Sequence, residues 1–305
     1  MHGIGIDVSK ATLEVAVYHG PWRQFDNTVA GHRKLAAWLK PLAVRRVVLE
    51  PTGGYEQQVL DALHAAGLPV VRANARQVRD FARATGQLAK TDRLDAAVLA
   101  QIAQVLDLPL YQPAHPWQRR LAEYVQSRRQ VVQMLVSAEQ QLGWVKDRQL
   151  RGALQANVLQ LTKSKAFLDQ QIAQQVRQQP QLEAIQTLKG VGPVLLAVLA
   201  SELPELGRLD GKAIAKLVGV APLARDSGTL RGTRSIWGGR ADIRQALYMS
   251  ALSALRYEPR LRQFYQSLRA RGKAAKVAIV AVMRKMLVIL NARARDAWSV
   301  LPAGE

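Results

Sequence analysis

Hydrophobic residues in the first hundred positions form short runs that polar turns separate. The runs Gly3–Val8 and Leu13–Tyr18 are rich in β-branched residues, and Ser9-Lys10-Ala11-Thr12 lies between them. Runs of this length and composition predict strands, and a short polar connection favours an antiparallel hairpin. We therefore expect the chain to begin with two paired strands.

After this hairpin, apolar residues at helical spacing alternate with further short apolar runs. The pattern predicts a helix over Gly31–Leu39, a strand over Arg46–Glu50, a helix over Tyr55–Ala66, a strand over Leu68–Ala73 and a helix from about Gln77. Strands that alternate with helices in this way are typical of an α/β domain, in which helices pack on a mixed sheet.

Prolines mark the next boundary, because Leu108–Trp117 contains three of them and the stretch from Gln118 to Gln178 contains none. Apolar residues then recur at a spacing of three and four, at Leu154, Val158, Leu161, Leu168, Ile172 and Val176. An earlier stripe that begins at Leu121 is weaker, since Arg128 occupies an apolar position. Two long helices are predicted. The stripes do not decide between a hairpin and pairing between protomers.

The last third of the chain, from Leu182, has the pattern of a compact helical region. Within it, Lys189, Gly190 and Gly192 precede a helical stretch that starts near Val194. This arrangement is similar to a helix-hairpin-helix element, where glycine amides and a helix N-terminus meet a DNA phosphate. A plain turn is an equally good interpretation, because glycines commonly precede helices.

The sequence thus predicts three parts: an α/β domain over residues 1–108, a linker with long helices over 109–180, and a mainly helical domain over 181–305. A length of 305 residues is sufficient for at least two domains with cores of their own.

The charge of the chain indicates which class of partner it binds. The net charge is +20, and residues 181–305 hold 20 Lys and Arg against 9 Asp and Glu. A polyanionic partner, with its main footprint on the C-terminal third, is the natural interpretation.

The absence of cysteine excludes disulfides, thiolate zinc sites and a cysteine nucleophile. No charged-then-apolar signal peptide begins the chain. The apolar run Val277–Leu290 is interrupted by Arg284 and Lys285 and is shorter than the roughly 20 residues of a membrane span. We therefore expect a cytoplasmic protein without a membrane partner.

Four acidic residues carry the candidate chemistry. Asp7 and Glu50 each end an apolar run, and Asp92 and Asp95 lie three apart at a predicted helix start, so they share one helix face. Clustered carboxylates repel one another unless a hard divalent cation lies between them. The set predicts metal-dependent phosphodiester chemistry.

Each acid also has an ordinary interpretation. Asp92 could cap its helix, and Asp95 could stabilise the positive end of the same helix. Asp7 is harder to explain in this way, because a carboxylate at the end of a buried strand is desolvated without a partner.

A second candidate, Ser227, lies in a glycine-rich segment that also contains Arg225, Arg231, Arg234 and Arg240. Guanidinium groups match the geometry of a phosphate. Serine becomes a nucleophile only when its proton is removed or the developing charge is stabilised. The alternative is a serine that caps a turn. The sequence has no Gly-x-Ser-x-Gly elbow here, so esterase chemistry has no support.

At this point the residues resemble a known family. Three segments are similar to the RuvC-like domain of DEDD-type insertion-sequence transposases: Gly5-Ile6-Asp7-Val8-Ser9-Lys10, Glu50-Pro51-Thr52-Gly53-Gly54-Tyr55-Glu56, and Lys90-Thr91-Asp92 with Asp95-Ala96. The resemblance implies a ribonuclease-H-like fold and Mg²⁺ bound by Asp7, Glu50, Asp92 and Asp95. The resemblance also implies a prokaryotic protein that is associated with the nucleoid. Lys10, which follows Asp7 in the turn, either contacts nucleic acid or orders the turn.

The C-terminal domain of the same family has a Ser-Gly in a Gly/Arg-rich segment, and Ser227 is the matching position. The resemblance implies that this serine attacks DNA and forms a covalent phosphoserine. Some members of the family are guided by a bridge RNA. The implied partners are therefore donor and target DNA, a guide RNA and further copies of the chain in a dimer or tetramer.

The sequence leaves three alternative functions to be tested. The first is a transposase or recombinase that uses both the carboxylates and Ser227. The second is a metal-dependent endonuclease of the Holliday-junction resolvase type, in which Ser227 is structural. The third is a basic nucleic-acid-binding scaffold without catalysis, whose acids are remnants.

Overall fold

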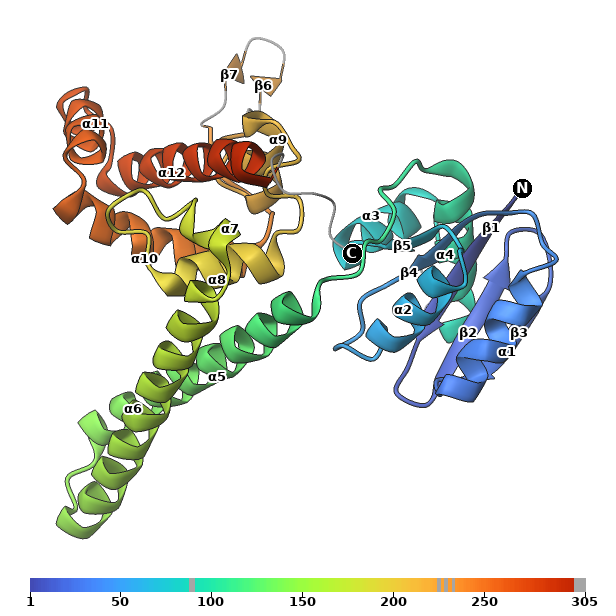
Figure 1. The fold of residues 1–305 in the computed structure, drawn as a ribbon, viewed down its shortest axis with the longest axis horizontal. Helices are drawn as coiled ribbons and strands as arrows, with labels where there is room; N and C mark the ends of the chain where they lie inside the picture. The colour runs from blue at the N-terminus through green and yellow to red at the C-terminus, as the bar shows by residue number, and fades with distance from the viewer. Residues whose placement is uncertain (88–90, 224–225, 228–229, 232–233, 299–305) are drawn as a thin grey trace. The chain divides into compact units, whose positions relative to one another are not determined.

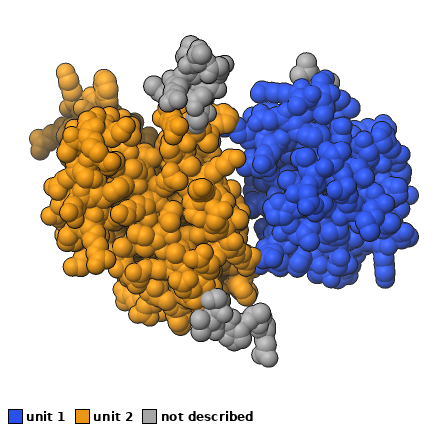
Figure 2. Space-filling model, turned by 90° about the horizontal axis from the view of Figure 1, so that it is seen from above, with its two compact units in different colours: residues 1–113 blue, residues 114–305 orange. Residues whose placement is uncertain are grey.

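The computed structural model describes residues 1–87, 91–223, 226–227, 230–231 and 234–298. The chain folds into two compact units, Met1–Pro113 and Ala114–Glu305, which are called unit 1 and unit 2 (Figure 2). The division falls inside the proline-containing segment, while the further division of unit 2 into assembly and C-terminal parts stays a prediction.

A five-stranded sheet forms the centre of unit 1 (Figure 1). Its strands are β1 (His2–Val8), β2 (Thr12–Val17), β3 (Trp22–Asp26), β4 (Val44–Leu49) and β5 (Val70–Arg72). The order across the sheet is β3-β2-β1-β4-β5. Strand β2 is antiparallel to its neighbours β1 and β3, whereas β4 is parallel to its neighbours β1 and β5. The mixed sheet with flanking helices and the initial hairpin are thereby confirmed.

Helices cover both faces of this sheet. They are α1 (Val29–Leu39), α2 (Gln57–Ala65), α3 (Ala75–Ala84) and α4 (Asp92–Val105). Along β1, Ile4 and Ile6 face a core that includes Leu35 of α1 and Leu60 of α2. The opposite face of β1 carries Gly3, Gly5 and Asp7, and it is covered by α4.

The strand β3 is an element that the hydrophobic pattern did not predict. Its sequence is Trp-Arg-Gln-Phe-Asp, and four of its five residues are exposed. An edge strand without a buried face does not show the alternation that identifies strands in a sequence. It pairs with β2 from Thr12 opposite Asp26 to Ala16 opposite Trp22.

Two glycines let α4 approach β1 at backbone contact distance. A Cβ atom added to Gly5 would lie 2.1 Å from the carbonyl oxygen of Ala96, and one added to Gly3 would lie 2.5 Å from that of Ala100. The facing residues Ala96 and Ala100 are themselves small and buried. Neither backbone can move aside, so only glycine fits at these positions of β1.

We expect Gly5→Ala to destabilise unit 1 by about 2 kcal/mol or more, because the added methyl group overpacks a backbone contact. Gly152→Ala is the matched control, since Gly152 is an exposed helical residue with nothing within 4 Å of an added Cβ. That control is expected to stabilise the protein by up to about 1 kcal/mol. Urea denaturation measures both. Equal small effects at the two positions would contradict the close approach of α4.

Unit 2 begins with a hairpin of two long helices, α5 (Pro116–Trp144) and α6 (Arg148–Arg177), which pack along each other (Figure 1). Arg128, which interrupted the apolar stripe, forms an ion pair with Asp169 of α6. Lys165 reaches the same carboxylate at 2.8 Å. The hairpin alternative is therefore confirmed, and Arg128 is accommodated by a charge on the facing helix.

The rest of unit 2 is a helical bundle around one core. Its elements are α7 (Pro180–Glu183), α8 (Pro193–Glu202), α9 (Gly211–Val218), β6 (Asp226–Ser227), β7 (Leu230–Arg231), α10 (Ala241–Tyr257), α11 (Pro259–Ala270) and α12 (Ala275–Trp298). Buried residues of α8, α10 and α12 meet in this core. In the described part of both units, no helix has the length and hydropathy of a membrane span.

Candidate carboxylate site and serine-bearing hairpin

Two neighbouring parallel strands bring the first pair of carboxylates together. Ile6 of β1 lies opposite Leu49 of β4, so Asp7 and Glu50 follow at the same register. Parallel strands end at the same edge of a sheet, and both side chains are partly exposed there. The sequence placed each acid at a strand end, and the sheet order makes the two strands neighbours.

Helix α4 brings the second pair. Gly3 lies against Ala100 and Gly5 against Ala96, so the helix runs in the opposite direction to β1. Its N-terminal turn, with Asp92 and Asp95, is therefore directed toward the end of β1 that carries Asp7. All four predicted acids converge at one edge of unit 1.

Thr91, and not Asp92, caps α4. The Thr91 hydroxyl accepts a hydrogen bond from the backbone N–H of Leu94 at 3.3 Å, and its backbone is extended. The capping alternative for Asp92 is thus wrong, because the preceding residue already fills that position. Asp92 is exposed and Asp95 is partly exposed.

The three other acids act electrostatically on Asp7. Burial, which has the largest effect, and the charges of Asp95, Asp92 and Glu50 together raise the pKa of Asp7 from 3.8 to about 6. The backbone N–H of Val8 partly opposes this shift. A nearby positive charge would therefore lower the pKa of Asp7 and favour its ionised form.

The raised pKa predicts how stability depends on pH in the absence of metal ions. Because Asp7 holds its proton up to about pH 6 in the folded protein and only to about 3.8 when unfolded, the folded state binds more protons between these values. The free energy of unfolding therefore falls as the pH rises through this window. We expect Asp7→Asn to lack this component, so that the variant is more stable than wild type at pH 7 and equal to it near pH 4. Urea denaturation in EDTA at both pH values measures it, and a constant difference between the two proteins would contradict it.

The donor set fits a hard divalent cation, since it consists of carboxylate oxygens alone. Within the described residues, no three acidic or histidine side chains are close enough to hold an ion as they stand. The negative charges of the other three acids nevertheless repel the ionised form of Asp7, and a bound cation would offset this repulsion. The chemistry and charge of the four side chains therefore agree with a metal site.

The second candidate segment forms a small antiparallel hairpin in unit 2. In β6, Ser227 pairs with Leu230 of β7, and Asp226 pairs with Arg231. Figure 1 shows the two strands beyond the helices of this unit. The side chains of these four residues lie outside the described part of the structure, as do Arg225 and Gly228 altogether.

The base of this hairpin is tightly closed. Leu223 and Ser235 form a β-bridge, with the N–H of Leu223 donating to the Ser235 carbonyl at 3.0 Å. Below it, a Cβ on Gly219 would lie 2.3 Å from the carbonyl oxygen of Gly238. Arg244 donates to that same oxygen at 2.7 Å. The segment that carries Ser227 is therefore anchored to α9 and α10 at both of its ends.

The predicted phosphate-binding arginines have different surroundings. Arg234 is exposed. Arg240 forms a bidentate pair with Glu205, with both N–O distances at 2.6 Å. A guanidinium held in this way is occupied by a carboxylate, so phosphate binding by Arg240 requires that the pair opens. Sequence reasoning could not find Glu205, which lies 35 residues away.

Other predicted nucleic-acid contacts are placed as follows. Lys10 and Lys189 are exposed in turns. Gly190 has φ +95°, and an added Cβ would lie 2.5 Å from the Cα of Ala254, so this glycine serves the packing of the turn on α10. Gly192 is the N-cap of α8 and has open space around it. Phosphate binding at this turn stays a prediction.

Sequence reasoning missed two polar residues beside the carboxylates. Glu56 is 1% exposed and accepts hydrogen bonds from the loop that follows Glu50. Asn27 donates to the carbonyl oxygens of Ser9 at 2.8 Å and Tyr55 at 3.2 Å. The available signal for Glu56 was a glutamate two positions after a Gly-Gly pair and directly before an amphipathic helix.

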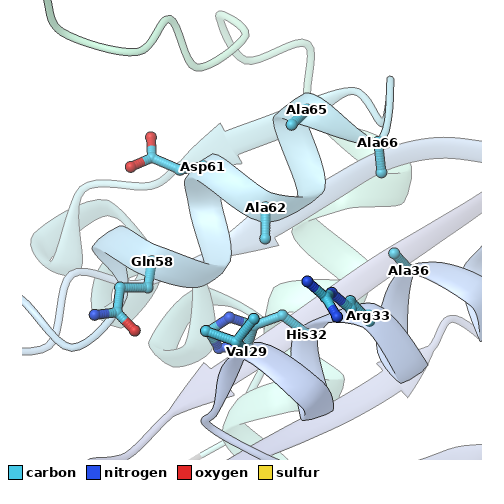
Figure 3. Close-up of a pocket in the computed structure, with 9 residues that line it drawn as sticks. All are labelled: Val29, His32, Arg33, Ala36, Gln58, Asp61, Ala62, Ala65 and Ala66. Carbon is cyan, nitrogen blue, oxygen red and sulfur yellow. The ribbon is translucent and has the colours of Figure 1, made fainter.

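A groove of about 600 Å³ lies between α1 and α2 (Figure 3). Small side chains such as Ala36, Ala62 and Ala65 line it, together with His32. The ring of His32 is buried and hydrogen-bonded to Asn27 at 2.7 Å. Because α1 and α2 cover the other face of the sheet, this groove is not part of the carboxylate site.

Comparison with known proteins identifies both halves of the chain. Residues 4–145 match a DEDD transposase model of the IS110 type, described as "Transposase". Residues 182–266 match a model described as "Transposase IS116/IS110/IS902 family". The first match contains the four carboxylates, and the second contains Ser227.

Individual relatives agree. The chain is 27% identical to the "Pilin gene-inverting protein" of Moraxella bovis, over 96% of this chain and 95% of that protein. It is 32% identical to the uncharacterized 42 kDa protein of insertion element IS900 from Mycobacterium paratuberculosis, over 42% of this chain and 33% of that protein. A similar match, 27% identical, covers 50% of this chain and 39% of the uncharacterized 43.6 kDa protein of IS110 from Streptomyces coelicolor.

These findings leave the non-catalytic scaffold without support, because the matched family consists of DNA-rearranging enzymes. DNA is the substrate of such enzymes, and a DEDD site implies dependence on a divalent metal ion. Because two models of this family match residues 4–145 and 182–266, the chain belongs to the IS110 family of DEDD transposases.

Proposed function

We propose that this transposase cleaves and rejoins the DNA strands of a mobile element with two sets of residues. Asp7, Glu50, Asp92 and Asp95 bind Mg²⁺, and Ser227 is the nucleophile. The observation that carries the metal part is that the ends of β1 and β4 and the first turn of α4 direct four carboxylates to one edge of unit 1, where the other three charges act on Asp7. The serine part rests on the resemblance and on the match of this segment to the family.

The carboxylates would act by holding positive charge against the scissile phosphate. Mg²⁺ bound there would stabilise the attacking and leaving oxygens of an in-line displacement. Asp7 is ionised above about pH 6, so its oxygens are available as ligands at neutral pH. Asp92 and Asp95 lie on the first turn of α4, and their partial exposure gives a DNA strand access to them.

Ser227 would break the strand by transesterification. Its Oγ attacks phosphorus, one bridging P–O bond breaks, the serine proton is released and the displaced strand oxygen takes up a proton. The product is a phosphoserine diester, which keeps the energy of the original phosphodiester. A hydroxyl of another strand then attacks the same phosphorus and restores the serine. This explains how strands can be rejoined without an external energy source, which attack by water would not permit.

Arginines near the serine would hold the phosphate during this exchange. A guanidinium offers two parallel donors to phosphate oxygens. Arg234 is exposed, and Arg225 and Arg231 belong to the same segment of the sequence. Arg240 would join them only after exchanging Glu205 for a phosphate. Lys10, Lys189, Gly190 and Gly192 complete the proposed nucleic-acid contacts.

Assembly into a dimer or tetramer would supply more than one active site, as strand exchange requires. Between residues 126 and 171, all of which the structure describes, only Ala138 is buried. Several large apolar side chains of α5 and α6 are exposed instead, namely Met134, Val136, Trp144, Leu150, Leu159 and Phe167. An exposed apolar surface of this kind favours contact with a second copy of the chain.

A guide RNA would choose the DNA sequence. The charge of +20 and the concentration of Lys and Arg after residue 181 suit a phosphate backbone, which carries no sequence information in itself. Base pairing by an RNA would provide that information. A structured transcript from the segment that borders the gene is the expected guide.

One experiment tests the proposal as a whole. The purified chain is incubated with Mg²⁺, DNA that carries the element ends, and RNA transcribed from the bordering segment. We expect a covalent protein–DNA adduct that mass spectrometry assigns to Ser227, and its formation should require the RNA. Cleaved DNA without any adduct would instead support the resolvase-type endonuclease.

A further inference from the structure

The loop between β4 and α2 directly follows Glu50, and one buried carboxylate holds it. Glu56, at the N-cap of α2, is 1% exposed. Its Oε2 accepts hydrogen bonds from the backbone N–H of Thr52 at 3.0 Å and of Gly54 at 2.9 Å. The loop is thus folded around a side chain supplied by the next helix.

The backbone of this loop is shaped to bind an anion. Gly53 and Gly54 have φ of +62° and +98°, a region that other residues rarely adopt. In a turn of this kind neighbouring N–H groups can point toward one position, as those of Thr52 and Gly54 do, and such concave sites bind anions. In this loop Glu56 provides the anion from within the chain.

A second bond continues from the loop to Glu50. The Thr52 hydroxyl donates to the backbone carbonyl of Glu50 at 3.3 Å, while the Thr52 N–H donates to Glu56. Asn27 also joins this loop to the end of β1, because its Nδ2 donates to Tyr55 and to Ser9. The backbones that carry Asp7 and Glu50 are therefore connected through one network.

The charge of Glu56 is compensated. Arg72, at the end of β5, donates to its Oε1 at 2.9 Å. Burial of an isolated carboxylate is unfavourable by several kcal/mol, whereas one with a cationic partner and two N–H donors is tolerated. Hydrogen bonds to an ionised acceptor are also about twice as strong as neutral ones. Glu56 can therefore hold the loop more firmly than a neutral side chain can.

We infer that Glu56 is a positioning residue for Glu50. By keeping the loop ordered, Glu56 holds Glu50 where its carboxylate can bind the cation. The inference rests on the proposed role of Glu50 as a metal ligand. Residues that orient metal ligands typically contribute about 10- to 100-fold to metal affinity. We therefore expect Glu56→Gln to weaken cation binding by about tenfold or more.

The test uses the full chain without DNA and has two readouts. Electron paramagnetic resonance follows the titration with Mn²⁺, and hydrogen exchange reports the amides of Thr52 and Gly54. Glu56→Gln should weaken Mn²⁺ binding and lower the protection of both amides, because a neutral amide oxygen accepts more weakly than a carboxylate oxygen. Arg72→Gln is the matched control, because it removes the ion pair and leaves in place the Glu56 oxygen that accepts from both amides. It should lower the stability of unit 1 and change Mn²⁺ affinity by less than about threefold.

The outcomes separate this inference from the proposed function. If Glu50→Gln abolishes Mn²⁺ binding while Glu56→Gln binds as wild type, the positioning role is wrong and the metal site stands. If Arg72→Gln and Glu56→Gln lose affinity in proportion to their loss of stability, Glu56 is merely structural. If Glu50→Gln binds Mn²⁺ as tightly as wild type, the carboxylate site itself is wrong.

Discussion

Replacing Asp7 by asparagine is expected to reduce DNA strand cleavage by more than about 100-fold, because the loss of a direct metal ligand exceeds the effect of losing a residue that orients one. Asparagine keeps the size of the side chain but removes the charge. Asp7 lies at the end of the central strand β1, and burial together with the charges of the other three acids raises its pKa to about 6.

The variant also separates activity from folding. Because the charge on Asp7 opposes folding at neutral pH in the absence of a cation, Asp7→Asn should be at least as stable as wild type while it is inactive. Asp80→Asn is the matched control, since that carboxylate is exposed on α3 and pairs with Arg76 at 3.9 Å. Cleavage is measured on element-end DNA over a range of Mg²⁺ concentrations. Full activity of Asp7→Asn would remove the metal site from the mechanism.

Replacing Ser227 by alanine is expected to abolish the covalent protein–DNA adduct and to reduce strand transfer by about 10³-fold or more, as the loss of a nucleophile does in other covalent enzymes. Alanine removes the attacking oxygen and leaves the backbone pairing of β6 with β7 unchanged. The anchored base at Gly219 and Arg244 should therefore still form.

The same variant distinguishes the two candidate enzyme functions. A resolvase-type endonuclease should continue to cut after Ser227→Ala, whereas the proposed recombinase should neither join strands nor accumulate an adduct. Ser267→Ala is a suitable control, because that hydroxyl is bonded at 2.8 Å to a carbonyl oxygen of its own helix α11. Denaturing gels resolve adduct and cleaved strand in one assay. Wild-type levels of adduct in Ser227→Ala would assign the nucleophile to another residue.

Local patterns predicted most of unit 1. The hairpin of β1 and β2, the strand β4 and the four acids at element ends were all visible in the sequence, because burial of one face imposes a period that can be read there. The strand β3 was not visible, since its residues face solvent and carry no such period. The alternative in which Asp92 caps α4 was wrong, because Thr91 occupies that position and both residue types cap helices well.

Long-range partners could not be predicted. Arg128 looked like an interruption until Asp169 supplied its charge from the facing helix. Arg240 looked available for phosphate, but Glu205 forms a bidentate pair with it. Pairing of this kind depends on which helices become neighbours, and a single sequence does not contain that information locally.

The contact between α4 and β1 limits how this enzyme can change over evolutionary time. The helix and strand backbones already lie as close as atoms permit at Gly3 and Gly5, and any side chain there would push them apart. The distance between the carboxylates can then be tuned only by exchanging aspartate for glutamate, one methylene at a time. A designer who seeks a different metal preference has the same narrow choice, with two glycines that tolerate no variation although they touch neither metal nor DNA.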